Sequence, residues 1–162
     1  MLIAIFASSK ISEEKYIAAI DRFRAAHPDE ACIDLIAIDS YVVKKDYQSA
    51  LQAVEQLDKA VGGDPYLRMM RANIYFAANQ LQDAEREALK AIAEDAGLVD
   101  AWLIRVNVSM KQRDFARTAE LLTKIQQDLN VELADLTTIP EYAEFVKSDE
   151  YQKWLADQRK TP

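Results

Sequence analysis

The sequence predicts an all-α fold made of repeated helix–turn–helix units. Apolar residues recur at steps of three and four positions in segments such as RANIYFAANQLQDAEREALKAI, residues 71–92, as in amphipathic helices. No segment shows a sustained alternation of apolar and polar residues, so strands are not expected. The third observation is a self-similarity with a period of about 34 residues, which is typical of repeat proteins.

The composition suits a folded protein that does not bind polyanions. Half of the 162 residues are hydrophobic, so the chain can bury a core as one continuous domain or a short repeat array. The formal net charge is −7, and the 20 Lys and Arg residues are scattered along the chain. Because no basic stripe can neutralise phosphate groups, neither nucleic acid nor a membrane surface is expected as a partner.

The cysteine content favours a reducing compartment. Cys32 is the one cysteine in the sequence, so no internal disulfide can form, and no Cys/His set has metal-ligand spacing. The apolar start, MLIAIFA, is far shorter than the roughly 20 residues of a membrane span and lacks the basic region of a signal peptide. We therefore expect a cytoplasmic protein. The start has no helix cap, which also fits a fragment of a longer protein.

Residues 1–30 are predicted to hold a degenerate half or whole repeat. The stretch SEEKYIAAIDRFRAAHP has helical periodicity, with Ser12 as its N-cap and Pro28 at its end. Residues 2–8 are interpreted as the remainder of a preceding helix.

Three units follow, at 31–64, 65–98 and 99–132. Each is predicted to be a helix, a tight turn and a helix, with breaks at GGDP and around Gly97. Residues of the same or related type stand one repeat period apart: Tyr41 and Tyr75, Ala50 and Ala84, Arg71 and Arg105, Asn73 and Asn107, and Tyr47, Leu81 and Phe115. We expect the two arginines to pair with acids such as Glu87 across helices, rather than to contact a ligand.

Small residues occupy core positions of the central unit. Ala72, Ala84, Ala88 and Ala91 lie where an amphipathic helix ordinarily carries Leu or Phe. We expect Ala72 and Ala84 to face each other across the two helices of their unit. Ala88 and Ala91 are expected to admit the first helix of the next unit.

Residues 133–162 are predicted to form C-terminal capping helices. Pro140 suits a helix start, and Ser148 suits the N-cap of a final helix. Because terminal repeats must cover an exposed apolar face, we expect Phe145 and Trp154 to be buried. The alternative for Trp154 is that it anchors a partner.

The repeat pattern is shared with a known family. The residues that match the pattern are Tyr41, Ala50 and Val54 in the first unit, Ala72, Tyr75 and Ala84 in the second, and Trp102, Val106, Thr118 and Leu122 in the third. Together with the length of the period, these positions resemble the tetratricopeptide repeat family. The copies are degenerate: Asp34 and Arg68 replace the aromatic at Trp102, Ser109 replaces the tyrosine, and the final proline is missing. The resemblance implies a right-handed α-α superhelix, or solenoid, with a C-terminal helical cap.

The same resemblance implies a concave binding groove built from the first helix of each unit. Its inward-facing residues would be Leu35, Asp39, Val42, Tyr66, Met69, Asn73, Phe76, Leu103, Asn107 and Met110. Asn73 and Asn107 either hydrogen-bond the backbone of a bound peptide or bridge neighbouring helices. One subclass of the family binds chaperone tails through basic residues, and Leu35, Met69 and Leu103 replace them here. No binding of chaperone C-terminal tails is therefore expected.

Catalytic motifs are missing from the sequence. His27 is the one histidine and precedes Pro28, which suits a solvated or capping role. Paired carboxylates such as Glu13–Glu14 stand at helix starts, where the helix dipole favours negative charge. GGDP lacks the strand and the lysine of a phosphate-binding loop. We expect no enzyme activity, no cofactor and no metal ion.

Two functional hypotheses remain. In the first, the protein is an adapter whose largely apolar groove binds a peptide or helical segment of another protein. In the second, it is a structural or self-associating module. Its groove is then filled by its own longer chain or by a second protomer in a homodimer.

Overall fold

A computed structural model shows that the chain is all-helical, which confirms the predicted class. It describes residues 18, 22, 26 and 31–158; residues 31–158 contain eight α-helices, two 3-10 turns and no strand. The predictions for residues 2–8, Ser12, His27 and Pro28 lie outside the described residues. The elements are α3 (Ala31–Val43), α4 (Tyr47–Val61), α5 (Pro65–Ala77), α6 (Leu81–Glu94), α7 (Val99–Lys111), α8 (Phe115–Asp128), η1 (Leu136–Thr138), η2 (Pro140–Tyr142), α9 (Ala143–Val146) and α10 (Asp149–Gln158).

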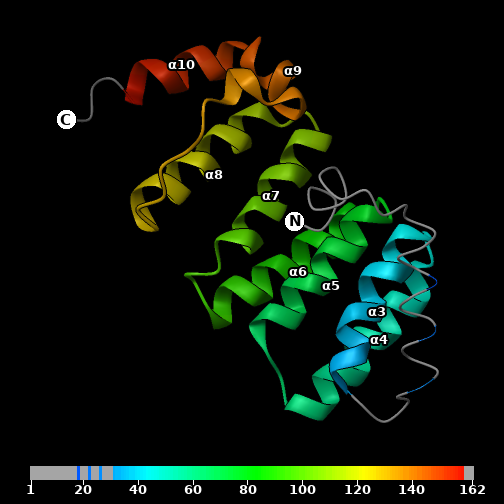
Figure 1. Cartoon of the computed structure of the whole chain (residues 1–162). Helices are drawn as coiled ribbons and strands as arrows, with labels where there is room; N and C mark the ends of the chain where they lie inside the picture. Colours follow the sequence, from blue (N-terminus) through cyan, green and yellow to red (C-terminus); the bar gives the residue numbers. More distant parts are fainter. Residues whose placement is uncertain (1–17, 19–21, 23–25, 27–30, 159–162) are drawn as a thin grey trace.

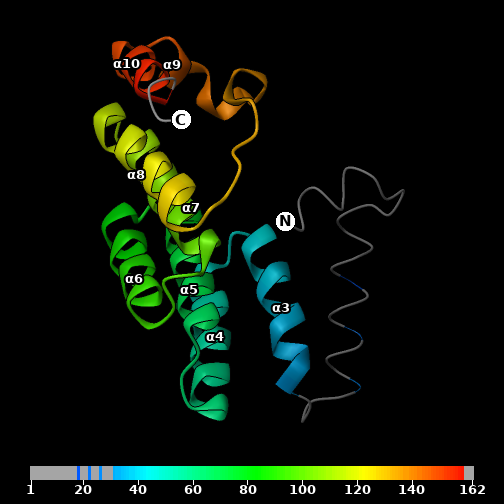
Figure 2. The ribbon, with the colours of Figure 1, turned by 90° about the vertical axis from the view of Figure 1, so that its left-hand side faces the viewer.

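The helices form three consecutive pairs with the period of the sequence. Helices α3, α5 and α7 begin one repeat period apart, and so do their partners α4, α6 and α8. Within each pair the two helices pack together, while α4 packs on α5 and α6 packs on α7. Helix α5 also contacts α7 directly. The pairs therefore follow one another through the molecule, with α9 and α10 at the far end beside α8 (Figures 1 and 2).

The turn inside each pair has the same hydrogen-bonded geometry. Lys45, Asn79 and Arg113 have φ values of 59°, 59° and 58°, in the left-handed region. The next residue donates its backbone N–H to a carbonyl five positions earlier, from Asp46 to Tyr41 at 2.8 Å in the first turn. Bonds from Gln80 to Tyr75 and from Asp114 to Ser109 repeat this arrangement. Each first helix thus ends in a Schellman motif, which turns the chain sharply enough for the second helix to pack back.

Aspartates cap three of these helices. Asp46 accepts a hydrogen bond from the Ser49 N–H at 3.2 Å, and Asp114 accepts one from the Arg117 N–H at 3.1 Å. Asp64 accepts from the Tyr66 N–H at 2.7 Å, and Pro65 follows it at the first helical position. The hydrogen bonds from Ser49 lower the pKa of the Asp46 carboxyl, because they favour its charged form.

The alanines predicted to admit close packing are fully buried. Ala72, Ala84, Ala88 and Ala91 are each 0 % exposed and belong to one cluster. Ala101 and Ile104 of α7 belong to the same cluster, so α7 approaches the α5–α6 pair over methyl-sized side chains. The expected burial of these four alanines is confirmed.

The third pair of helices, α7 and α8, has a polar contact in place of the alanine packing of α5 and α6. Ser109 on α7 and Thr118 on α8 stand where the preceding pair has Tyr75 and Ala84. Both are 0 % exposed, and their hydroxyl oxygens lie 2.8 Å apart. Each hydroxyl also lies near a backbone carbonyl of its own helix, Ser109 2.8 Å from that of Val106 and Thr118 3.0 Å from that of Asp114. Since each hydroxyl has one proton, one of them donates to the other, and the second donates to its carbonyl.

The C-terminal segment covers the end of α7 and α8 with aromatic side chains. Phe145 is 0 % exposed, and its ring contacts those of Phe115, Tyr151 and Trp154. The Trp154 Nε1–H donates to the Thr123 hydroxyl of α8 at 3.0 Å. The predicted burial of Phe145 and Trp154 is confirmed.

The prediction was less accurate for how this segment begins. Pro140 starts a 3-10 turn rather than an α-helix, and α9 is four residues long. The chain bends at Ser148, whose hydroxyl donates to the Phe145 carbonyl at 2.6 Å and accepts from the Tyr151 N–H at 3.2 Å. Ser148 therefore ends α9 and caps α10, which confirms the predicted cap but keeps the preceding helix short.

Candidate functional site

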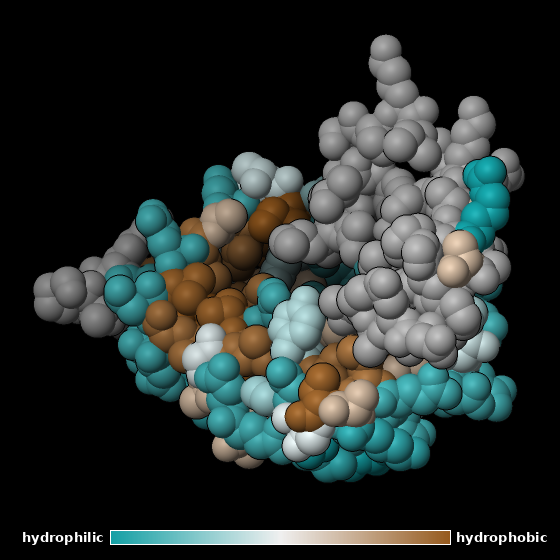
Figure 3. Space-filling model, turned by 60° about the horizontal axis from the view of Figure 1, so that its bottom comes forward, coloured by the Kyte–Doolittle hydropathy of each residue, from teal (hydrophilic) through white to brown (hydrophobic). Residues whose placement is uncertain are grey.

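A groove lies between the first helices of the three pairs. It has a volume of about 490 Å3 and is partly open to solvent. The space-filling view shows apolar side chains gathered around a hollow, with hydrophilic side chains at its rim (Figure 3). The groove is lined by Ile38 and Asp39 of α3, by Tyr66, Met69, Met70, Asn73 and Ile74 of α5, and by Asp100, Leu103, Ile104 and Asn107 of α7.

The structure brings together most of the residues that the sequence assigned to a groove. Six of them line it: Asp39, Tyr66, Met69, Asn73, Leu103 and Asn107. Three others, Val42, Phe76 and Met110, are partly buried against three different core clusters and are not lining residues. Each lies near the end of its helix, where the chain turns toward the second helix. Leu35 belongs to α3, and its side chain lies outside the described part of the chain.

Five lining residues were missed by the sequence reasoning: Ile38, Met70, Ile74, Asp100 and Ile104. The repeat could have identified some of them. Asp100 stands one repeat period after Tyr66, and Ile104 stands one period after Met70. Applying the period to Tyr66, which was predicted, would have found Asp100; Met70 and Ile104 are equivalent to each other, and both were missed.

A column of polar side chains crosses the groove. Asp39, Asn73 and Asn107 occupy equivalent positions of successive repeats, on α3, α5 and α7, and all three line it. Asn73 and Asn107 are exposed, and Asn73 donates its amide to the Met69 sulfur at 3.1 Å within the same helix. The bridging role considered for Asn73 is therefore not observed, and its amide oxygen faces no donor among the described residues. Burial raises the pKa of the Asp39 carboxyl, because desolvation disfavours its charged form.

The surface beside this column is apolar. Met69 and Ile104 are each 3 % exposed and reach the lining from the cluster that contains the buried alanines. Tyr66 remains 49 % exposed at the edge, although it is a large aromatic residue. Such a surface can bury an apolar side chain, while the Met thioethers adapt to its shape.

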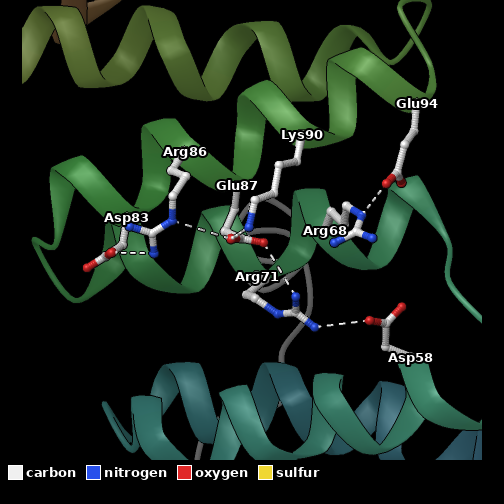
Figure 4. Close-up of polar contacts among 8 residues, drawn as sticks. All are labelled: Asp58, Arg68, Arg71, Asp83, Arg86, Glu87, Lys90 and Glu94. Atoms are coloured by element: carbon white, nitrogen blue, oxygen red, sulfur yellow. Dashed lines mark hydrogen bonds and ion pairs between the residues drawn. The ribbon is translucent and has the colours of Figure 1, made fainter.

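Ion pairs hold the groove-forming helices to their neighbours. Arg71 of α5 lies 3.3 Å from Asp58 of α4 and 3.4 Å from Glu87 of α6, so it links three helices (Figure 4). Lys90 also contacts the buried Glu87 carboxylate, at 2.8 Å, and Arg68 of α5 lies 2.6 Å from Glu94 of α6. The expected pairing of Arg71 with Glu87 is confirmed.

Arg105 makes the corresponding link from α7. It lies 2.8 Å from Glu85 of α6, which also binds Arg117 of α8. Its guanidinium stacks 5.3 Å from the Trp102 ring centre. Both predicted arginines therefore serve the packing of helices and are not lining residues of the groove.

Two further pockets have a different character. One, of about 430 Å3, lies between α4, α5 and α6, where its Arg71, Asp58 and Glu87 pair with one another. The other, also about 430 Å3, lies between α8 and α10 and is lined by side chains such as Glu120, Lys153 and Asp157. Neither combines a repeated polar column with an apolar surface, so the groove is the stronger candidate site.

The described residues offer no other obvious chemistry. Among them, no three His, Cys, Asp or Glu side chains are grouped to hold a metal ion. None of the helices described has both the length and the apolar character needed to cross a membrane. No protein-family model matches the chain, and comparisons with curated proteins and with solved structures gave no match either.

Proposed function

We propose that this protein is a non-enzymatic interaction module whose groove between α3, α5 and α7 binds a segment of another protein. The observation that carries the proposal is the column of Asp39, Asn73 and Asn107, which recurs once in each repeat along a partly apolar groove. An amide offers a donor and an acceptor together, so a row of amides can bond peptide groups at intervals along a bound chain. The segment adds apolar contacts to Met69 and Leu103.

The proposal includes tetratricopeptide-like repeats arranged as a right-handed superhelix. Its support is that the first helices, the second helices and the left-handed turn residues each recur with the period of the sequence. In a repeat array of this kind, equivalent residues of successive first helices line one continuous surface. Asp39, Asn73 and Asn107 stand at such equivalent positions, one in each first helix.

The expected class of partner follows from charge and chemistry. A net charge of −7 disfavours nucleic acid and anionic membranes, and the groove lacks basic residues for chaperone carboxylate tails among its described lining. The lone Cys32 supports a cytoplasmic location. The competing occupant is a second copy of this chain or a part of its own longer chain, and the experiment below tests the first of these.

The experiment is selection of random peptides of about a dozen residues, displayed on phage, against the full chain. Enriched peptides are then synthesised and titrated against the double variant Asn73→Ala/Asn107→Ala. Both asparagines are exposed and alanine favours helix, so this variant should remain folded. The matched control is Gln82→Ala, an exposed amide on α6 that is not a lining residue.

We expect the double variant to bind at least roughly tenfold more weakly, since each lost hydrogen bond is worth about 1 kcal/mol. The control should bind like the original chain. Equal binding by all three proteins would show that the groove is not the site. A homodimer in light scattering that the double variant dissociates would favour self-association.

A further inference from the structure

We propose that the groove selects a segment with a basic side chain, Lys or Arg, which Asp39 binds while Asn73 and Asn107 hydrogen-bond the backbone of that segment. The inference rests on the proposed function and names its ligand class. The polar column is not a strict repeat, because one of its positions carries a carboxylate where the other two carry amides. An amide can bond any peptide group, whereas a carboxylate accepts only, and prefers a cation.

The charges around the groove are one-sided. Its described lining residues include two carboxylates, Asp39 and Asp100, and no Lys, Arg or His. No salt bridge among the described residues involves either aspartate. By contrast, most carboxylates of the neighbouring helices are paired, as Glu85 and Glu87 are. A cationic segment is therefore complementary to the groove, and an acidic segment is repelled by it.

The environment of Asp39 gives the contact additional strength. The side chain is partly buried, and desolvation holds the pKa of its carboxyl above the ordinary value. A basic group that reaches it compensates this cost in surroundings of lower dielectric than water, where attraction between charges is stronger. Asp100, in the first turn of α7, is exposed, so its field is screened by solvent and contributes mainly to attraction at a distance.

The column also restricts where the basic residue stands in the segment. Packed helices lie about 8–10 Å apart, and an extended chain rises about 3.3 Å per residue. In a segment bonded to both Asn73 and Asn107, the two bonded peptide groups therefore lie about three positions apart. Because Asp39 lies on α3, the basic side chain is expected on the Asn73 side of the segment. An apolar side chain would face Leu103 and Met69 between the amides.

The test uses the peptides enriched on the full chain. Each is titrated against the original chain, against Asp39→Asn, and against Asp128→Asn, which removes an exposed carboxylate at the end of α8 outside the groove. Asn is nearly isosteric with Asp, and thermal unfolding verifies that each variant is folded. Two peptide derivatives complete the design: one replaces each basic residue by norleucine, and the other acetylates the N-terminus.

We expect Lys or Arg to be enriched and Asp39→Asn to weaken binding by roughly tenfold or more, as loss of a charge-assisted hydrogen bond does. The norleucine peptide should bind the original chain about as weakly as the original peptide binds Asp39→Asn. Asp39→Asn should not weaken the binding of the norleucine peptide further. Binding should weaken with added salt, while Asp128→Asn and N-acetylation should leave it unchanged.

Three results would overturn the inference. Enriched peptides that are neutral or acidic would exclude a cationic ligand, and loss of binding on N-acetylation alone would assign the contact to a terminal amine. If Asp39→Asn binds normally while Asn73→Ala/Asn107→Ala does not, the groove binds a segment but Asp39 does not select it. If neither variant loses binding, or no peptide is enriched, the proposed function itself is wrong.

Discussion

The hydroxyl groups of Ser109 and Thr118 lie 2.8 Å apart inside the crossing of α7 and α8. Both side chains are fully buried, so water cannot replace the hydrogen bond between them. The preceding crossing, of α5 and α6, has Tyr75 and Ala84 at the equivalent positions, and Tyr75 packs against the cluster that contains Ala84. In the third unit, Ser109 and Thr118 thus form a hydrogen-bonded pair where the second unit has Tyr75 and Ala84.

This pairing predicts a measurable coupling. Ser109→Ala and Thr118→Val should each lower the free energy of unfolding by about 1 kcal/mol, because each leaves a buried hydroxyl with fewer partners. The double variant should lose less than the sum of the two, by roughly 0.5–1.5 kcal/mol. Urea unfolding of the four proteins measures this difference. Strict additivity would contradict a direct contact between the two hydroxyls.

Ala84 should not tolerate a larger side chain. It is fully buried where α6 packs on α5, so Ala84→Leu should overpack the crossing and cost about 1–3 kcal/mol. Ala93→Leu, an exposed position on the same helix, is the matched control and should cost less than about 0.5 kcal/mol. Thermal unfolding compares them. A variant at Ala84 as stable as its control would place this alanine outside the close approach.

The turn between α3 and α4 should be stabilised by glycine. Lys45 is exposed and has a φ of 59°, a conformation that costs residues with a Cβ roughly 1 kcal/mol. Lys45→Gly should therefore raise the free energy of unfolding by about 0.5–1 kcal/mol. Gln52→Gly, at an exposed position inside α4, should lower it by a similar amount, because glycine disfavours helix. Shifts of the same sign in both variants would contradict the turn geometry.

Glu87 should matter more to stability than other paired carboxylates. Its side chain is 5 % exposed and neutralises Arg71, whereas the Glu55–Lys59 pair is more than half exposed on both sides. Glu87→Ala leaves Arg71 with Asp58 alone and should cost about 2–4 kcal/mol. Glu55→Ala should cost less than about 0.5 kcal/mol. Chemical denaturation of both variants tests this, and equal losses would mean that burial of Glu87 adds nothing.

Local pattern was sufficient to predict the helices and much of their packing. The period of the sequence matches the starts of six helices, and small side chains at Ala72, Ala84, Ala88 and Ala91 correctly indicated close approach. The recurrence of Arg71 at Arg105, one repeat period later, led to the prediction that Arg71 pairs with an acid such as Glu87, and the structure shows this pair. These features depend on residue size and period, which a sequence displays directly.

The lining of the groove was predicted less completely, because it depends on how each helix is rotated about its axis. The face predicted for each first helix included Phe76 on α5 and Met110 on α7, which pack against core clusters near the helix ends. It omitted Asp100 and Ile104, which line the groove at the positions equivalent to Tyr66 and Met70. Nor could the period predict the contact between Ser109 and Thr118, since that pair exists only in the third unit.

The most direct test of the account is to observe the methionine methyl groups by NMR while an enriched peptide is added. The chain has four methionines, of which Met69 and Met70 line the groove and Met110 packs against a different cluster. Labelling with [methyl-13C]methionine and substitution of each methionine by leucine assign the signals. We predict that the Met69 and Met70 signals shift and that the Met110 signal does not. A bound peptide that shifts the Met110 signal and leaves the Met69 and Met70 signals unchanged would contradict binding in the groove.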